Sequence, residues 1–162
     1  MGWIIAGIVV VVLIISYIIG KKEEAGKTGK TASAGKGSLI AGRETIAYFK
    51  DDVVYDRNMV NIGTYKPSDI NTGWHYDFIF DDKIVGYYQS TGDDIKIWRQ
   101  GKNLWDMECV GRIYSNDCIV PEKDNYEVIL FTGDSVGAAA AYVILCYEFI
   151  KYDNNYMQYF IK

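Results

Sequence analysis

Apolar and polar residues alternate along this chain on two different length scales. The first apolar run, "WIIAGIVVVVLIISYII" at 3–19, contains no charged residue. As a helix it would be about 26 Å long, slightly less than a hydrocarbon core of about 30 Å. Beyond residue 38 the apolar runs are short, and Asp, Asn and Gly residues separate them, which is typical of β-hairpins. The pattern therefore predicts a membrane helix followed by a mainly β domain.

We interpret the segment 1–20 as an uncleaved transmembrane helix that contacts the lipid bilayer through residues 3–19. Trp3 and Tyr17 suit the two membrane interfaces. A cleaved signal peptide would need basic residues before the apolar run, and its best cleavage site, "ASA" at 32–34, is too far downstream. The myristoylation pattern fails, because an alanine stands where Ser or Thr is required.

The next segment, "KKEEAGKTGKTASAGKGS" at 21–38, predicts a flexible tether and leaves 39–162 as the β domain. Its lysines all follow the apolar run, so the positive-inside rule predicts a single-pass protein of the cell membrane with a cytoplasmic C-terminal domain. The reversed orientation is the alternative. A P-loop is disfavoured, because the GxxxxGK[ST] spacing and a preceding strand are both missing.

Four segments of the β domain share one skeleton, in which an apolar residue, an aromatic residue and a turn-opening residue precede Val or Ile and Gly. They are "VYDRNMVNIG" at 54–63, "IFDDKIVG" at 79–86, "LWDMECVG" at 104–111 and "LFTGDSVG" at 130–137. The aromatic residues recur at spacings of 25, 25 and 26 residues, at Tyr55, Phe80, Trp105 and Phe131. A fixed period of this size predicts repeated supersecondary units, here hairpins or small meanders.

A glycine ends each copy of the skeleton: Gly63, Gly86, Gly111 and Gly137. Glycine within a strand usually marks a bulge or a close approach of backbones. We therefore expect a mainly β fold with four pseudo-symmetric β-hairpin or meander repeats around a crowded central axis. The four aromatic residues would pack as a ring in the core or between neighbouring units, and Gly133 would supply the turn of the last hairpin.

Four copies of this motif followed by "GAAAAYVIL" resemble the four-fold β-flower domain of small bacterial proteins. The resemblance covers roughly residues 39–145. It implies four hairpin units about a pseudo-four-fold axis, ended by an Ala-rich apolar segment, and it implies no reaction. Two features depart from the pattern: the first turn is two residues longer, and Thr132 replaces Asp in the last copy.

The C-terminal segment combines two opposing preferences. Ala138–Ala141 favour a helix, whereas several residues of Tyr142–Tyr147 favour a strand. The apolar run is too short to cross a membrane, so we expect a buried element, most simply a helix, that plugs or flanks the repeats. The chain ends in an aromatic tail that either packs on the domain or forms a partner surface: Tyr152, Tyr156, Tyr159 and Phe160.

Composition disfavours several classes of function. A formal net charge of −4 disfavours nucleic-acid binding. Three cysteines without a CxxC pair predict neither a disulfide framework nor a zinc site. We expect no bound cofactor, because no nucleotide-binding, HExxH or EF-hand motif occurs.

Three carboxylates, Asp56, Asp81 and Asp106, open the predicted turns. If these turns met at one end of the axis, their oxygen atoms would suit a hard cation such as Ca²⁺. The favoured interpretation is that each carboxylate closes its own turn by accepting backbone N–H groups.

The candidates for ligand binding are Trp74, His75 and Trp98, the Trp rings serving as stacking platforms for carbohydrate or cell-wall material in the reversed orientation. His75 is the sole histidine, and Asp77 could orient its imidazole in a hydrolase. That hydrolase is the least favoured alternative, because a lone histidine is more often a packed side chain. We expect instead a non-catalytic protein-interaction or scaffold module at the bacterial cell membrane that binds another protein or itself.

Overall fold

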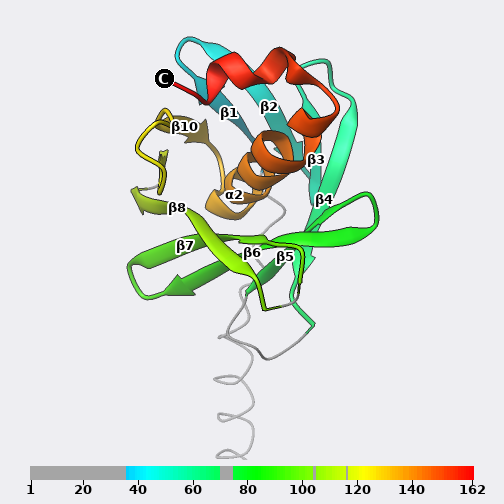
Figure 1. The fold of residues 1–162 in the computed structure, drawn as a ribbon, viewed down its shortest axis with the longest axis vertical. Helices are drawn as coiled ribbons and strands as arrows, with labels where there is room; N and C mark the ends of the chain where they lie inside the picture. Colours follow the sequence, from blue (N-terminus) through cyan, green and yellow to red (C-terminus); the bar gives the residue numbers. More distant parts are fainter. Residues whose placement is uncertain (1–35, 70–74, 104, 116) are drawn as a thin grey trace, which may run out of the picture. The chain divides into compact units, whose positions relative to one another are not determined.

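The structure is a computed structural model, and it describes residues 36–69, 75–103, 105–115 and 117–162. These residues form a closed antiparallel barrel around a helix (Figure 1). The strands follow one another around the barrel in chain order: β1 (Gly37–Ala41), β2 (Glu44–Lys50), β3 (Val53–Asp56), β4 (Asn61–Pro67), β5 (Tyr76–Phe80), β6 (Lys83–Thr91), β7 (Asp94–Gln100), β8 (Met107–Ser115), β9 (Cys118–Pro121) and β10 (Ile129–Thr132). Strands β1 and β10 pair through Leu39 and Phe131 and close the barrel. The predicted mainly β class is confirmed.

The predicted membrane helix at 1–20 and most of the predicted tether at 21–38 lie outside the described residues. Within the residues that the structure describes, no helix is both long enough and apolar enough to span a bilayer. The anchor and the orientation of the domain therefore stay predictions.

The chain enters the barrel interior after β10. Helix α2 (Ser135–Val143) continues into the π-helical turn η1 (Ile144–Glu148), and two 3₁₀ segments follow, η2 (Phe149–Lys151) and η3 (Asn154–Tyr159). The Asp134 carboxylate caps the start of α2 by accepting a 2.7 Å hydrogen bond from the Gly137 N–H. The expected C-terminal helix is confirmed.

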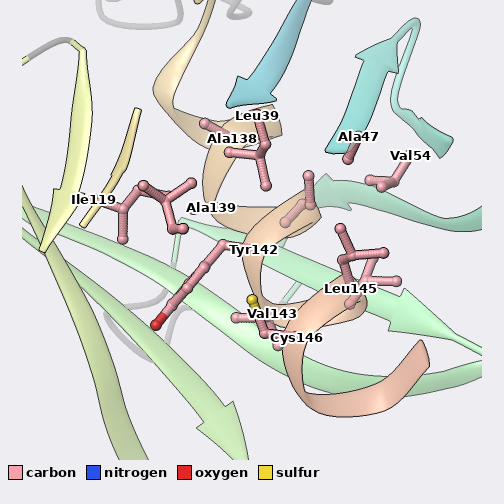
Figure 2. Packing of buried hydrophobic residues seen from close by; sticks show 14 of the residues in the cluster. Leu39, Ala47, Val54, Ile119, Ala138, Ala139, Tyr142, Val143, Leu145 and Cys146 are labelled. Carbon is pink, nitrogen blue, oxygen red and sulfur yellow. The ribbon is translucent and has the colours of Figure 1, made fainter. Parts of the chain in front are cut away.

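The position of α2 follows from the width of the barrel. The interior of an eight-stranded barrel is about as wide as side chains can fill, so a ten-stranded barrel leaves room for a helix. The segment from Val136 to Glu148 is buried throughout, and a helix that is apolar all round needs such an enclosure. Figure 2 shows Leu39, Val54 and Ile119 packed around α2.

Four hairpins present the same large–small pair to the helix. In each, a fully buried apolar residue is the register partner of a small residue: Leu39–Ala47, Val54–Gly63, Phe78–Gly86 and Ile97–Gly111. A β-bulge follows each large residue. A Cβ atom on the three glycines would lie 2.8 Å from Ile144 for Gly63, 3.0 Å from Val143 for Gly86 and 3.3 Å from Tyr142 for Gly111. Three successive residues of the central helical segment thus approach three glycines.

The repeat differs from the prediction in its last copy. Strand β10 is followed by α2 and not by a second strand, so Gly137 lies on the helix, where its Cα faces the Phe49 ring. The reason is local: Gly133 turns the chain with a φ of +89°, and Asp134 then caps a helix. The fourth small residue of the barrel is Ala47, in the first hairpin.

The predicted ring of four aromatic residues does not form. Phe131 is buried, Tyr55 and Phe80 are half-buried, and Trp105 is 94% exposed. Trp105 lies in the loop between β7 and β8, because the strand register makes Trp98–Arg99, and not the motif pair at 104–105, the equivalent of Ile79–Phe80. The β7–β8 loop is longer than the β5–β6 turn, so the start of the third motif copy lies in the loop and not at the end of a strand.

We expect Gly86→Ala to lower the free energy of unfolding by about 2 kcal/mol, because overpacking a well-filled core typically costs 1–3 kcal/mol. The new Cβ atom would lie 2.4 Å from the Trp98 carbonyl oxygen, which belongs to the backbone and cannot swing away. Chemical denaturation followed by circular dichroism measures the change. Val128→Ala, at an exposed side chain, is the control and should change the value by less than about 0.5 kcal/mol. Equal stability of the two variants would contradict a tight contact between barrel and helix.

Candidate functional site

The end of the barrel at which the central helix leaves carries most of the exposed apolar side chains of the described turns. We call it the helix-exit end. It comprises the β3–β4 turn, the β5–β6 turn, the β7–β8 loop and the tail from Phe149 onward. Exposed Met59 and Val60 come from the first of these, Trp105 from the third and Tyr152 from the tail. Segments far apart in the sequence therefore meet at one surface.

A groove with a volume of about 560 Å³ lies between β4 and β5 at this end, and we call it the β4–β5 groove. Its walls are mostly apolar and come from both strands, the turn beside them and the tail: Val60–Thr64, Ile79–Asp82, Phe149 and Tyr152. The Phe80 and Tyr152 rings stack with their centroids 6.0 Å apart. Tyr152 remains 75% exposed and Val60 55% exposed, so the groove has an apolar rim in contact with water.

A second recess, which we call the charged cleft, lies on the other side of the β5–β6 turn and has a volume of about 760 Å³. Its lining includes four cations and three carboxylates: Lys83, Arg99, Lys102, Lys151, Asp106, Glu108 and Glu148. Glu148 is buried and pairs with Arg99 at 3.2 Å and Lys151 at 2.5 Å. This pairing fixes the end of the central helix to strand β7.

Aromatic rings reinforce the same junction. The Arg99 guanidinium lies over the Tyr147 ring, 5.3 Å from its centroid, and the Tyr147 and Tyr142 hydroxyls are 3.3 Å apart. Burial raises the pKa of both phenols well above the usual range. Both hydroxyls therefore stay protonated and serve as hydrogen-bond partners, and Tyr142 donates to the Val110 carbonyl oxygen at 3.3 Å.

The three turn carboxylates occupy separate turns. Asp56 is buried, and its Oδ1 accepts backbone N–H groups from Asn58 and Val60, each at 2.8 Å. Asp81 is exposed in a two-residue turn with a positive φ, and Asp106 is exposed at the end of the β7–β8 loop. Among the described residues no group of three or more His, Cys, Asp or Glu side chains is placed to hold a metal ion.

The other sequence candidates lie at the opposite end or on the outer wall. His75 precedes β5, and its Nδ1 accepts a hydrogen bond from the Ser90 N–H at 3.2 Å. Among the described residues, the buried Oδ1 atom of Asp77 has no hydrogen-bond partner. Trp74 lies outside the described residues.

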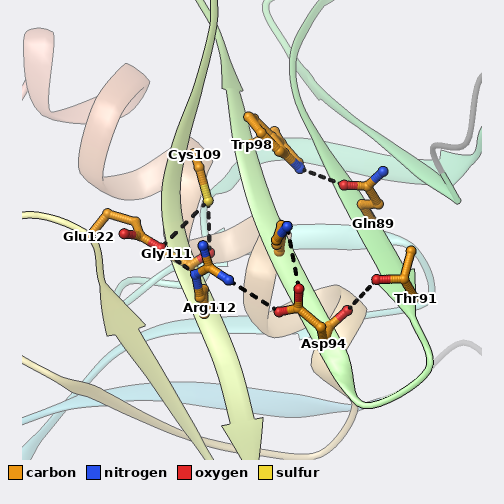
Figure 3. A network of polar contacts seen from close by, with 9 residues as sticks. Gln89, Thr91, Asp94, Trp98, Cys109, Gly111, Arg112 and Glu122 are labelled. Atoms are coloured by element: carbon orange, nitrogen blue, oxygen red, sulfur yellow. Dashed lines mark hydrogen bonds and ion pairs between the residues drawn. The ribbon is translucent and has the colours of Figure 1, made fainter.

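Trp98 belongs to an aromatic pair on the outer wall of the barrel. Tyr87 is its register partner on β6. The Tyr87 hydroxyl donates a hydrogen bond to Gln100 Oε1, and the Trp98 indole N–H donates one to Gln89 Oε1, both at 3.1 Å. Figure 3 shows Trp98 with Gln89 and, on the neighbouring strand, Arg112 between Asp94 and Glu122. Burial, and secondarily the neighbouring Glu122, raises the pKa of the Cys109 thiol, which argues against an activated nucleophile there.

Sequence reasoning did not identify the β4–β5 groove. Its lining residues come from two strands and a tail that are far apart in the chain, and no motif joins them. The only available signals were the aromatic residues of the tail and the "MV" pair in the first turn. Comparisons of the chain with protein-family models, with curated proteins and with solved structures found no match. Functional inference therefore depends on the residues themselves.

We expect Asp56→Ala to destabilise the fold by about 1–2 kcal/mol, because two backbone N–H groups of the β3–β4 turn lose their charged acceptor. Hydrogen exchange at the Asn58 and Val60 amides should become faster. Asp56→Asn is the matched control, since its side-chain oxygen can still accept. If exchange at both amides were unchanged in Asp56→Ala, the carboxylate would not be closing the turn.

We expect Arg99→Met to lower the free energy of unfolding by about 2 kcal/mol, because the buried Glu148 carboxylate loses one of its two cations. Adding Glu148→Gln should restore most of that loss, since the uncompensated charge is removed. Urea denaturation of both variants and of Glu148→Gln alone provides a double-mutant cycle. Additive losses would show that the two side chains are not coupled.

Proposed function

We propose that this chain is a non-catalytic protein-interaction module that binds a partner protein through the helix-exit end of its barrel. In this proposal, residues 3–19 hold the module at the bacterial cell membrane and the barrel lies in the cytoplasm. The repeated large–small hairpins also support a proposed relationship to the four-fold β-flower family.

The observation that carries the proposal is the set of apolar side chains exposed at one end of the barrel. Trp105 and Tyr152 are 94% and 75% exposed, and Val60 and Tyr152 form the rim of the β4–β5 groove. Exposed apolar residues that gather around a recess are typical of protein-binding surfaces, and Trp and Tyr contribute most often to binding energy there. Single exposed apolar residues scattered elsewhere need no such explanation.

The interior of the barrel has no room for a ligand. Helix α2 and η1 fill it, and the side chains of this segment are buried against the strands. The module would therefore act through its outer surface, in the way that many rigid barrels present binding loops at one end.

A saccharide-binding module is the second candidate function. It is favoured by the Tyr87–Trp98 pair on the outer wall, where two neighbouring rings each have a side-chain amide close by. Aromatic faces with adjacent hydrogen-bonding groups suit sugar rings. This alternative uses a different surface, so variants at the helix-exit end would leave it unaffected.

Site-specific photo-crosslinking tests the first proposal. We expect a benzophenone amino acid in place of Tyr152, in the full chain in cell membranes, to crosslink one discrete protein. Adding Val60→Asp should abolish the crosslink, because it places a charge at the groove rim. Tyr114, exposed on β8, is the control position and should not crosslink the same protein. A crosslink that forms equally from Tyr114, or that survives Val60→Asp, would contradict binding at this surface.

A further inference from the structure

We propose that the β4–β5 groove binds an extended segment of the partner protein that carries a large apolar side chain next to a lysine or arginine. This inference rests on the proposed function and specifies the chemistry of the partner. It follows from three properties of the groove: an incomplete strand pairing, an apolar lining and two acidic residues on its rim.

The first property is the early end of the pairing between β4 and β5. The two strands are in register from Pro67–Tyr76 to Thr64–Ile79, although β4 begins at Asn61 and β5 extends to Phe80. Residues 61–63 therefore have no register partner in β5, while Asn61 and Gly63 still pair with β3 on their other side. The groove occupies this opening.

An open stretch of strand favours an extended ligand. A strand edge offers backbone groups that can pair with another chain, and many peptide-binding domains recognise extended segments in this way. The volume of about 560 Å³ lies within the usual range for ligand sites. Gly63 contributes only backbone atoms to the lining, because Ile144 and the Ile79 carbonyl oxygen occupy the space that its Cβ atom would need.

The apolar lining requires an apolar anchor on the ligand. Ile62 and Ile79 contribute from the strands, and the Phe80, Phe149 and Tyr152 rings lie around them. A large aliphatic or aromatic side chain placed there would remove Val60 and Tyr152 from water, and burying such side chains stabilises a complex.

The charge of the rim selects the neighbouring residue of the ligand. Among the described residues, Asp81 and Asp82 are the only charged ones that line the groove. Both are exposed, and within the described chain no ion pair is formed by either of them. Complementary charges at a rim guide specificity, so a cationic side chain beside the anchor fits.

Selection from a random peptide library displayed on phage, with the full chain in detergent micelles as the target, tests this chemistry. We expect the enriched peptides to share an apolar residue adjacent to Lys or Arg. Enrichment of acidic peptides, or of apolar peptides without a charge preference, would overturn the inference. A selection that enriches no common sequence would overturn it as well.

A matched pair of turn variants then locates the binding. We expect Asp81→Asn with Asp82→Asn to weaken binding of the best enriched peptide about tenfold, measured by fluorescence anisotropy. Asp51→Asn with Asp52→Asn is the control, because it changes an equivalent two-residue acidic turn with similar positive φ values at the other end of the barrel. Both pairs should fold, since Asn tolerates this backbone conformation. Equal affinity of the two double variants would overturn the assignment of the cation to this rim.

The outcome separates this inference from the proposed function. If the Tyr152 crosslink forms and depends on Val60, but the partner region that it marks lacks an apolar residue beside a basic one, the interaction module stands and the inference about its ligand fails. A crosslink to a second copy of this chain would also overturn the inference. If Tyr152 formed no crosslink, the result would contradict the proposed function itself.

Discussion

Filling the interior of the barrel is the physical requirement on which the rest of this structure depends. A closed ten-stranded barrel leaves no unpaired edge strand, although the pairing of β4 with β5 ends at Thr64–Ile79, and its interior is wider than strand side chains can fill. The chain meets this requirement with its own helix, and Ala138–Ala141 keep that helix narrow. The strands leave space for the helix at Gly63, Gly86 and Gly111, where a side chain would collide with the helical segment or the neighbouring strand. Helix and barrel are therefore mutually dependent for stability.

The helix-exit end is a consequence of the same requirement. A helix that runs inside the barrel must leave at one end, and its last turns determine what is placed there. The buried Glu148 carboxylate pairs with Arg99 of β7, which holds the end of η1 against that strand, and with Lys151 of η2. The chain then turns, so that Phe149 and Tyr152 reach the opening between β4 and β5. The groove thus exists because the element that fills the core also supplies one wall of the surface site.

Much of the barrel could be predicted from the sequence, because hairpin turns and strand glycines depend on local physical chemistry. The positions of Gly63, Gly86 and Gly111 show this, since each needs only its own strand pair. Ala47 performs the same role without a glycine, so a motif ending in Gly could not include the first hairpin. Gly137 matched the motif by spacing alone and lies on the helix. The groove could not be predicted, because it joins β4, β5 and the tail only once the barrel has closed.

The tail shows how folding and binding roles can be separated within one short segment. Tyr156 and Phe160 are buried, and the Arg57 guanidinium lies 5.0 Å from the centroid of the Tyr156 ring. Tyr159 donates to Glu44 and accepts from Arg57. These three residues attach the tail to the barrel. Tyr152 contributes little to that attachment, since it is 75% exposed and stacks on Phe80 at the rim of the groove. Tyr152 therefore remains exposed at the groove that we propose as the binding site for a partner segment.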